Sequence, residues 1–265
     1  MKTFSYLFLS FLAAFTFLGT GIAGCGKQKD LVAVQSGFED TPQAAPVAVP
    51  LYEASGIADC TRNKSGLWVI EDSGNPAELL LLQKDGSSVR RFPLRDGTNT
   101  DWEDLILING DIYIADMGDN TKSRKECTIY RFPEPELTAD TIYNYQKIRF
   151  TYPDRPHDAE GFLVDPGTRD IFIITKSDPA SAVYKLSYPY RYTQTDTLAK
   201  VADLPYNGVT AASISRDGKE ILVKTYRKIY YYQRKGTQSL DQALSGEPRE
   251  LSYRMEPQGE SVAFA

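Results

Sequence analysis

The sequence predicts an all-β fold and, within that class, a β-propeller with blades of about 50 residues. Short apolar strands recur in groups of four, a similar motif opens each group, and the period between groups is typical of propeller blades. No stretch keeps the 3.6-residue apolar spacing of an amphipathic helix, so an α/β fold is not expected. Two stacked sandwiches would also contain many short strands, but they would not repeat one opening motif.

Each repeat opens on a strand of acidic and small residues. The five openings start at Glu53, Asp101, Asp158, Thr210 and Gln258, with successive starts 48, 57, 52 and 48 residues apart. Second strands are expected at 67–70, 112–115, 171–174 and 221–224, and third strands at 79–82, 129–132, 183–186 and 229–232. Turn-forming pairs such as Asn109-Gly110 and Asp217-Gly218 separate the strands. The sequence therefore predicts four complete four-stranded blades.

The fifth repeat is incomplete. It begins at Gln258, and the sequence stops at Ala265 after a single strand. Residues 26–50 are too short and too rich in proline to supply the missing strands. We therefore expect a propeller of five or more blades that lacks its C-terminal strands. The alternative is an irregular ring with an open edge, which is costly.

The N-terminal residues have the character of an export signal. A positive start at Lys2 precedes an apolar run over 4–18, which is short for a membrane span. Residues 22–25, Ile-Ala-Gly-Cys, resemble the lipobox of bacterial lipoproteins. The resemblance implies cleavage before Cys25, a diacylglycerol on its sulfur and an acyl chain on its new amino group, which together hold a protein on a membrane. A secretory signal with a chance cysteine is the alternative.

The expected organisation has three parts: a lipoprotein signal peptide over 1–24, the lipidated Cys25 with a flexible tether over 25–50, and a propeller domain over 51–265. We expect a cell-envelope protein that is lipid-anchored in the outer membrane of a Gram-negative bacterium. Whether it faces the periplasm or the cell surface is open. The formal net charge of −5 argues against nucleic acid as a partner, because nucleic-acid binders normally have a basic face.

Histidine and cysteine are scarce. A single histidine excludes HExxH zinc sites and paired-histidine centres within one chain. His157 precedes Asp158 and could act as a general base, but a solvated loop histidine is the favoured interpretation. No Gly-x-Ser-x-Gly elbow is present. Cys60 and Cys127 are expected on different blades, so a disulfide between them is not favoured.

The repeats predict an acidic mouth at one end of the central channel. The first strand of a blade lines the channel, and side chains two apart on a strand share a face. Aligned openings give one column with Glu53, Asp101, Asp158, Thr210 and Gln258, and a second column with Ser55, Glu103, Glu160, Ala212 and Glu260. The second strands end at the same rim and add candidate ligand-binding residues: Asp72, Asp116, Asp119, Asn120, Lys176 and Arg227.

So many carboxylates cannot all ionise close together without a counter-charge. One candidate is a hard cation such as Ca²⁺, which takes six to eight oxygen ligands. The other is internal, because Lys176, Arg227 and Arg124 could pair with the acids or bind an anionic ligand. A third interpretation is structural, since acidic residues at strand ends often cap turns.

The sequence contains four motifs: Asp101-Trp-Glu-Asp104, Gly118-Asp-Asn120, Asp158-Ala-Glu-Gly161 and Gln258-Gly-Glu260. They resemble a family of mostly uncharacterised bacterial propeller proteins. The pattern of an acidic first strand followed by an aromatic second strand is more distantly similar to the gluconolactonase/regucalcin, NHL-repeat and phytase-like propellers, several of which hold Ca²⁺ in the channel. The resemblance implies a channel metal site whose oxygen ligands are Glu53, Asp101, Glu103, Asp158, Glu160 and Glu260, with Asp116, Asp119 and Asn120 beside them.

Two hypotheses about function follow. The first is a non-enzymatic lipoprotein whose propeller mouth binds a ligand or an envelope protein through a Ca²⁺-occupied acidic channel. The second is a Ca²⁺-dependent hydrolase of a lactone or phosphoester, with Glu103 or Glu160 as the base for a metal-activated water.

Overall fold

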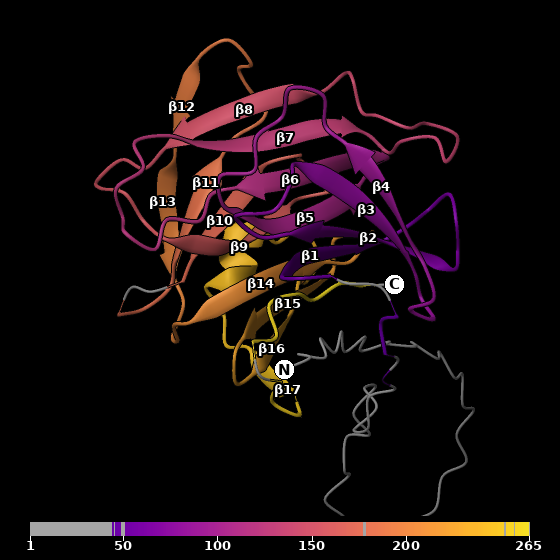
Figure 1. Cartoon of the computed structure of the whole chain (residues 1–265). Helices are drawn as coiled ribbons and strands as arrows, with labels where there is room; N and C mark the ends of the chain where they lie inside the picture. The colour runs from indigo at the N-terminus through magenta and orange to yellow at the C-terminus, as the bar shows by residue number, and fades with distance from the viewer. Residues whose placement is uncertain are drawn as a thin grey trace, which may run out of the picture.

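The computed structural model describes residues 44, 46–48, 51–176, 179–251, 253–256 and 258–264. The predicted signal peptide, Cys25 and most of the tether lie outside this part of the chain. The described residues form an all-β structure of four antiparallel blades, which confirms the predicted β-propeller (Figure 1).

The strands follow one another outward in each blade. Blade 1 contains β1 (Ala54–Asp59), β2 (Gly66–Glu71), β3 (Glu78–Gln83) and β4 (Val89–Pro93). Blade 2 contains β5 (Trp102–Ile108), β6 (Asp111–Asp116), β7 (Cys127–Pro133) and β8 (Gln146–Thr151). Blade 3 contains β9 (Ala159–Val164), β10 (Ile171–Thr175), β11 (Ala182–Leu186) and β13 (Ala199–Asp203). Blade 4 contains β14 (Val209–Ile214), β15 (Glu220–Thr225), β16 (Ile229–Gln233) and β17 (Arg249–Leu251).

Two short elements were not expected from the sequence. β12 (Thr195–Thr197) pairs in parallel with β8, so a segment of the blade 3 sequence covers the outer edge of blade 2. The helix α1 (Leu240–Leu244) lies between β16 and β17 and buries both of its leucines in the core. No helix among the described residues is long and apolar enough to cross a membrane.

The inner strands β1, β5, β9 and β14 gather in the middle of the molecule, with the outer strands around them (Figure 1). Asp104 on β5 couples three of these strands. Its side chain accepts hydrogen bonds from the backbone N–H groups of Leu105 (2.8 Å), Ala212 on β14 (3.2 Å) and Phe162 on β9 (3.4 Å). Complete burial raises the pKa of Asp104 well above its usual range. This carboxyl group is therefore a structural link at the centre of the channel.

Residues 258–264, the predicted start of the fifth repeat, form no strand ladder in the described structure. The segment lies beside β14, where the Phe264 N–H donates to Ser213 Oγ (3.3 Å) and the buried Lys224 ammonium donates to the Gly259 carbonyl. It also packs against the apolar cluster of blade 1. The segment therefore fills the seam between blades 4 and 1, which is the position of a further inner strand.

Candidate functional site

One β-bulge near the start of each inner strand shapes the mouth of the propeller. The ladder between the first and second strands of every blade skips one residue there, and the skipped residues are Ser55, Glu103, Glu160 and Thr210. A bulge redirects a side chain out of the regular alternation of the sheet. Blades 2 and 3 therefore direct a carboxylate from the bulge, and blades 1 and 4 direct a hydroxyl group.

The bulges correct the sequence alignment of the fourth repeat. The alignment of the repeats predicted that Thr210 corresponds to Asp101 and Ala212 to Glu103. The strand register shows instead that Thr210 is the equivalent of Glu103. The hydroxyl groups of blades 1 and 4 have matching roles. Ser55 Oγ donates to the Trp102 carbonyl (2.7 Å), and Thr210 Oγ1 donates to the Gly259 carbonyl (3.4 Å). The two accepting residues, Trp102 and Gly259, therefore correspond, and the residues that follow them, Glu103 and Glu260, occupy equivalent positions.

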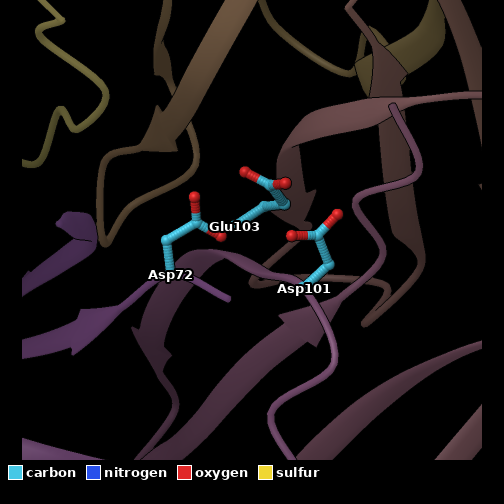
Figure 2. A group of neighbouring side chains, drawn as sticks. All are labelled: Asp72, Asp101 and Glu103. Carbon is cyan, nitrogen blue, oxygen red and sulfur yellow. The ribbon is translucent and has the colours of Figure 1, made fainter. Parts of the chain in front are cut away.

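Five carboxylates form two neighbouring groups at the mouth. Asp72, Asp101 and Glu103 offer ligand oxygens within 4.8 Å of one another, and so do Glu103, Asp158 and Glu160. Figure 2 shows the carboxylates of Asp72, Asp101 and Glu103 converging from the ends of β2 and β5. The structure thus brings together four of the six predicted metal ligands, and it adds Asp72, which the sequence indicated only as a ligand-binding residue.

The carboxylates of these two groups are costly to ionise together. Burial, followed by repulsion from Glu160 and other nearby acids, raises the pKa of Glu103 to about 11. Burial raises the pKa of Glu160 to about 8, although the Lys176 ammonium opposes this change. Burial and the charge of Asp72 raise the pKa of Asp101 to about 6, and burial also raises the pKa of Asp72. The five carboxylates therefore require either protons or an external cation to offset their charge.

Two of these carboxylates lack the partners that buried charges normally have. Glu103 is only 7% exposed and makes no hydrogen bond or ion pair with another described residue. Glu160 is 5% exposed; its Oε1 pairs with Lys176, while its Oε2 is buried without a hydrogen-bond partner among the described residues. Buried polar atoms are usually satisfied, so this exception points to a missing ligand.

A cation and a phenol lie on the other side of the Glu160 carboxylate. Lys176 Nζ lies 5.5 Å from the centre of the Tyr226 ring, and the Tyr226 hydroxyl donates to Glu260 Oε1 (3.2 Å). Glu260 and the exposed Glu53 both act electrostatically on Asp72. These two predicted metal ligands are therefore at the rim and do not belong to either group of converging carboxylates.

The other predicted ligand-binding residues shape a loop or face solvent. Asp116 pairs with Arg124 (2.8 Å), and Asp119 accepts the Arg124 N–H (2.7 Å). The Asp119 N–H in turn donates to Asp158 Oδ1 (3.0 Å), so this loop supports the site from behind. The side chains of Asn120 and Arg227 are exposed. Neither belongs to the groups of converging carboxylates.

Gly118 forms the wall behind the first group of carboxylates. A Cβ atom at this position would overlap the carboxylates of Glu103 and Asp101. A side chain other than hydrogen would therefore push the two acids apart. The Gly118-Asp-Asn120 motif matters here through its glycine, whose role the sequence did not indicate.

His157 is buried, so the expectation of a solvated loop histidine was wrong. Its side chain is 3% exposed, and Nε2 lies 2.9 Å from the Tyr184 hydroxyl and 3.0 Å from Asp154 Oδ1. The ring also packs against Tyr152, with ring centres 4.8 Å apart. Aromatic packing holds the loop before β9 in place, which explains the burial of this histidine.

The two described cysteines are free and buried, as expected from their predicted separation on different blades. The Cys60 thiol points to Glu134 Oε1 at 3.5 Å, whereas Cys127 contacts the Met117 carbonyl at 3.9 Å. Burial raises the pKa of Cys127 to about 12, so this thiol is not poised as a nucleophile.

Comparisons with known proteins support the fold class. No protein-family model matches the chain, and a search of curated protein sequences found no match. A chain of a nidogen/laminin complex is similar in structure, with a TM-score of 0.52 and 12% identity over 85% of this chain and 75% of that one. This likeness shows the fold alone.

Two bacterial structures have weaker similarity. An auxiliary nutrient binding protein from Bacteroides thetaiotaomicron VPI-5482 has a TM-score of 0.48 and 10% identity over 75% of this chain. A functionally unknown protein from Desulfotomaculum acetoxidans DSM 771 has a TM-score of 0.45 and 15% identity over 83% of this chain. The chain spans 41% of the first protein and 63% of the second. Fold and site together define a β-propeller with a carboxylate-rich mouth.

Proposed function

We propose that this chain is a cell-envelope lipoprotein whose propeller mouth binds Ca²⁺ and, through it, a ligand or a partner protein. The observation that carries the proposal is the position of Glu103, a buried carboxylate that has no partner among the described residues and lies within reach of four other carboxylates. The donor atoms are all oxygens and come from several blades, which suits a hard cation with a large and adaptable coordination shell.

A purely structural role fits these carboxylates poorly. Asp119 is an example of a carboxylate that caps a loop: burial would raise its pKa, but hydrogen bonds from Ser123, Arg124 and Thr121 lower it. Glu103 has the opposite environment, since burial and neighbouring acids raise its pKa and no donor opposes them. A bound cation would reverse this penalty because it favours the ionised form.

A ligand would reach the cation at the group of Asp72, Asp101 and Glu103, which is the outer of the two groups. Asp72 and Asp101 are only half-buried, whereas Glu103, Asp158 and Glu160 are buried. A cation held by these acids would keep coordination positions toward the solvent, where water or an oxygen of a ligand would complete its shell. The proposed ligands are therefore molecules with carboxylate, hydroxyl or phosphate oxygens.

Calorimetry of the purified, chelator-treated chain with Ca²⁺ tests the cation site. We expect saturable binding in the wild type and its loss in Glu103→Gln, while the exposed Glu247→Gln, which removes the same charge elsewhere, binds normally. Failure of the wild type to bind Ca²⁺ at millimolar concentration would overturn the proposal. Ca²⁺-dependent turnover of a lactone or phosphoester that disappears in Glu160→Gln would instead show the hydrolase of the second hypothesis.

The lipid anchor has its own test. Cys25 lies outside the described residues, and the support for its lipidation is the lipobox-like sequence. Metabolic labelling with radioactive palmitate should mark the wild-type chain in the membrane fraction. Cys25→Ser should abolish the label and leave the chain uncleaved or released. An unlabelled wild-type chain would remove the anchor from the proposal without affecting the cation site.

A further inference from the structure

We propose that the mouth holds two divalent cations bridged by the Glu103 carboxylate. This inference rests on the proposed cation site and specifies its composition. Glu103 is the one residue common to the two groups of converging carboxylates, and each group offers three ligand oxygens within 4.8 Å of one another. A carboxylate shared between two cations about 3.5–4 Å apart is a recurrent arrangement in two-metal sites.

The charge of the group fits two cations better than one. Among the described residues, the five carboxylates make one direct ion pair, between Glu160 and the Lys176 ammonium. Full ionisation therefore leaves a net charge of −4. A single divalent cation would leave half of this charge in a mostly buried site, whereas two would neutralise it. The Arg124 guanidinium also acts electrostatically on Asp101, but its direct ion pair is with Asp116 (2.8 Å), which lies outside the two groups.

The two positions differ in burial and in their remaining partners. The inner position lies among Glu103, Asp158 and Glu160, all buried, and one of these acids, Glu160, has a buried oxygen (Oε2) without a hydrogen-bond partner among the described residues. An unpartnered buried oxygen beside two other carboxylates is the arrangement expected at a position that a cation completes. The inner cation would therefore be dehydrated and exchange slowly.

The outer position lies among Asp72, Asp101 and Glu103, where the two aspartates are half-buried. Figure 2 shows the three carboxylates directed toward one another. The absence of a side chain at Gly118 leaves room for the carboxylates of Glu103 and Asp101 to lie side by side. The outer cation would retain water and exchange more readily, and it is the one that a ligand would reach.

Mn²⁺ is a suitable probe, because it accepts oxygen ligands and its electron paramagnetic resonance reports on pairs. The full chain is loaded with Mn²⁺, freed of excess metal and examined by elemental analysis and by spectroscopy. We expect two Mn²⁺ per chain with an exchange-coupled spectrum. Asp72→Asn should retain only the inner ion and Glu160→Gln only the outer one, each with the uncoupled six-line spectrum, whereas Glu103→Gln should lose coupling and most of the metal.

The outcomes separate the two proposals. One Mn²⁺ per wild-type chain would overturn the bridged pair and leave the proposed function standing, and no Mn²⁺ or Ca²⁺ at all would overturn both. Two ions with uncoupled spectra would overturn the bridge. Glu247→Gln should behave as the wild type, and melting curves of each variant show whether lost metal reflects lost folding. Asp72→Asn is the variant least able to disturb the fold, because Asp72 is half-buried after the end of β2.

Discussion

Glu103→Gln is expected to stabilise the cation-free protein while it abolishes cation binding. In the folded chain the pKa of Glu103 is raised from 4.5 to about 11, chiefly by burial. At pH 7 folding must therefore transfer a proton to this carboxyl group. The cost grows by about 1.4 kcal/mol for each pH unit above the ordinary pKa, which gives roughly 3 kcal/mol at pH 7. The same cost follows from any folded pKa well above 7, because the group then stays protonated.

Glutamine has nearly the same shape as the protonated acid and carries no such cost. A raised folded pKa means that the contribution of Glu103 to stability is intact below pH 4.5 and declines as the pH rises toward the folded pKa. The substitution should therefore have little effect at pH 4.5 and stabilise by roughly 3 kcal/mol at pH 7. In thermal melts with EDTA, this corresponds to an increase in Tm of roughly 6–12 °C at pH 7.

Calcium should reverse the order of the two proteins. Saturating Ca²⁺ should raise the Tm of the wild type and leave that of Glu103→Gln unchanged, because only the wild type gains binding free energy. Glu247→Gln in EDTA controls for the loss of one negative charge from the surface. An increase in Tm of the same size at pH 4.5 and pH 7, or destabilisation by Glu103→Gln at pH 7, would refute the protonated, buried state of Glu103.

Three further predictions concern the wall of the site, a link between blades and the C-terminal segment. Gly118→Ala should weaken Ca²⁺ binding at least tenfold in calorimetry, since the added methyl group displaces two carboxylates, whereas Gly167→Ala, which has ordinary contacts, should bind normally. Glu134→Gln should lower the free energy of unfolding in urea by about 1–3 kcal/mol at pH 7, because it weakens the hydrogen bonds that the Trp68 indole and the Thr61 N–H donate to this carboxylate. Burial tends to raise the pKa of Glu134, but those hydrogen bonds lower it below its usual value. The difference in the free energy of unfolding between variant and wild type should therefore shrink below pH 4. A difference that stays constant with pH would contradict this. Lys224→Met should increase tryptic cleavage after the exposed Arg254 several-fold, because it removes the ammonium that holds the C-terminal segment, and an unchanged digestion rate would show that other contacts suffice.

The blades could be predicted because the four main strands of each blade come from one contiguous stretch of sequence. Alternating apolar residues and turn-forming pairs are local signals, and the hairpins they predict are the ones that the chain forms. Asp101, Glu103, Asp158 and Glu160 could be found for the same reason, since two repeats carry the same acidic spacing. The three-residue β12 and the five-residue α1 are too short to produce a periodic signal.

The bulges could not be predicted, because only the register of the ladder shows which residue is skipped. The repeat alignment therefore paired Thr210 with Asp101, and this prediction was wrong because Thr210 occupies the position of Glu103. Asp72 follows the end of β2, and its contact with blade 2 depends on how the two blades pack. Burial of His157 likewise depends on packing against Tyr184 of blade 3, which lies 27 residues away in the sequence.

The four bulges explain why the bulge positions of only blades 2 and 3 supply carboxylates to the site. The hydroxyl groups of Ser55 and Thr210 each bond to the backbone of the next inner segment, so these positions connect neighbouring blades. Glu103 and Glu160 make no such bond in the described structure, and their carboxylates face the mouth instead. The blades that supply the acids therefore need another connection, and Asp104, the residue after Glu103, provides it through bonds to β9 and β14.

The positions equivalent to Asp104 in the other blades carry small residues that allow the inner strands to pack closely. The register places Gly56, Gly161 and Ala211 at these positions, and each carries at most a methyl group. A Cβ atom at Gly56 would lie 2.6 Å from the Leu105 nitrogen, and one at Gly161 would lie 3.0 Å from a Val209 methyl group. The channel thus holds one carboxyl group at this level, and it accepts three backbone hydrogen bonds. The preceding residue, Glu103, has no partner among the described residues and belongs to both groups of converging carboxylates, so adjacent residues of β5 separate the stability of the propeller from its proposed binding chemistry.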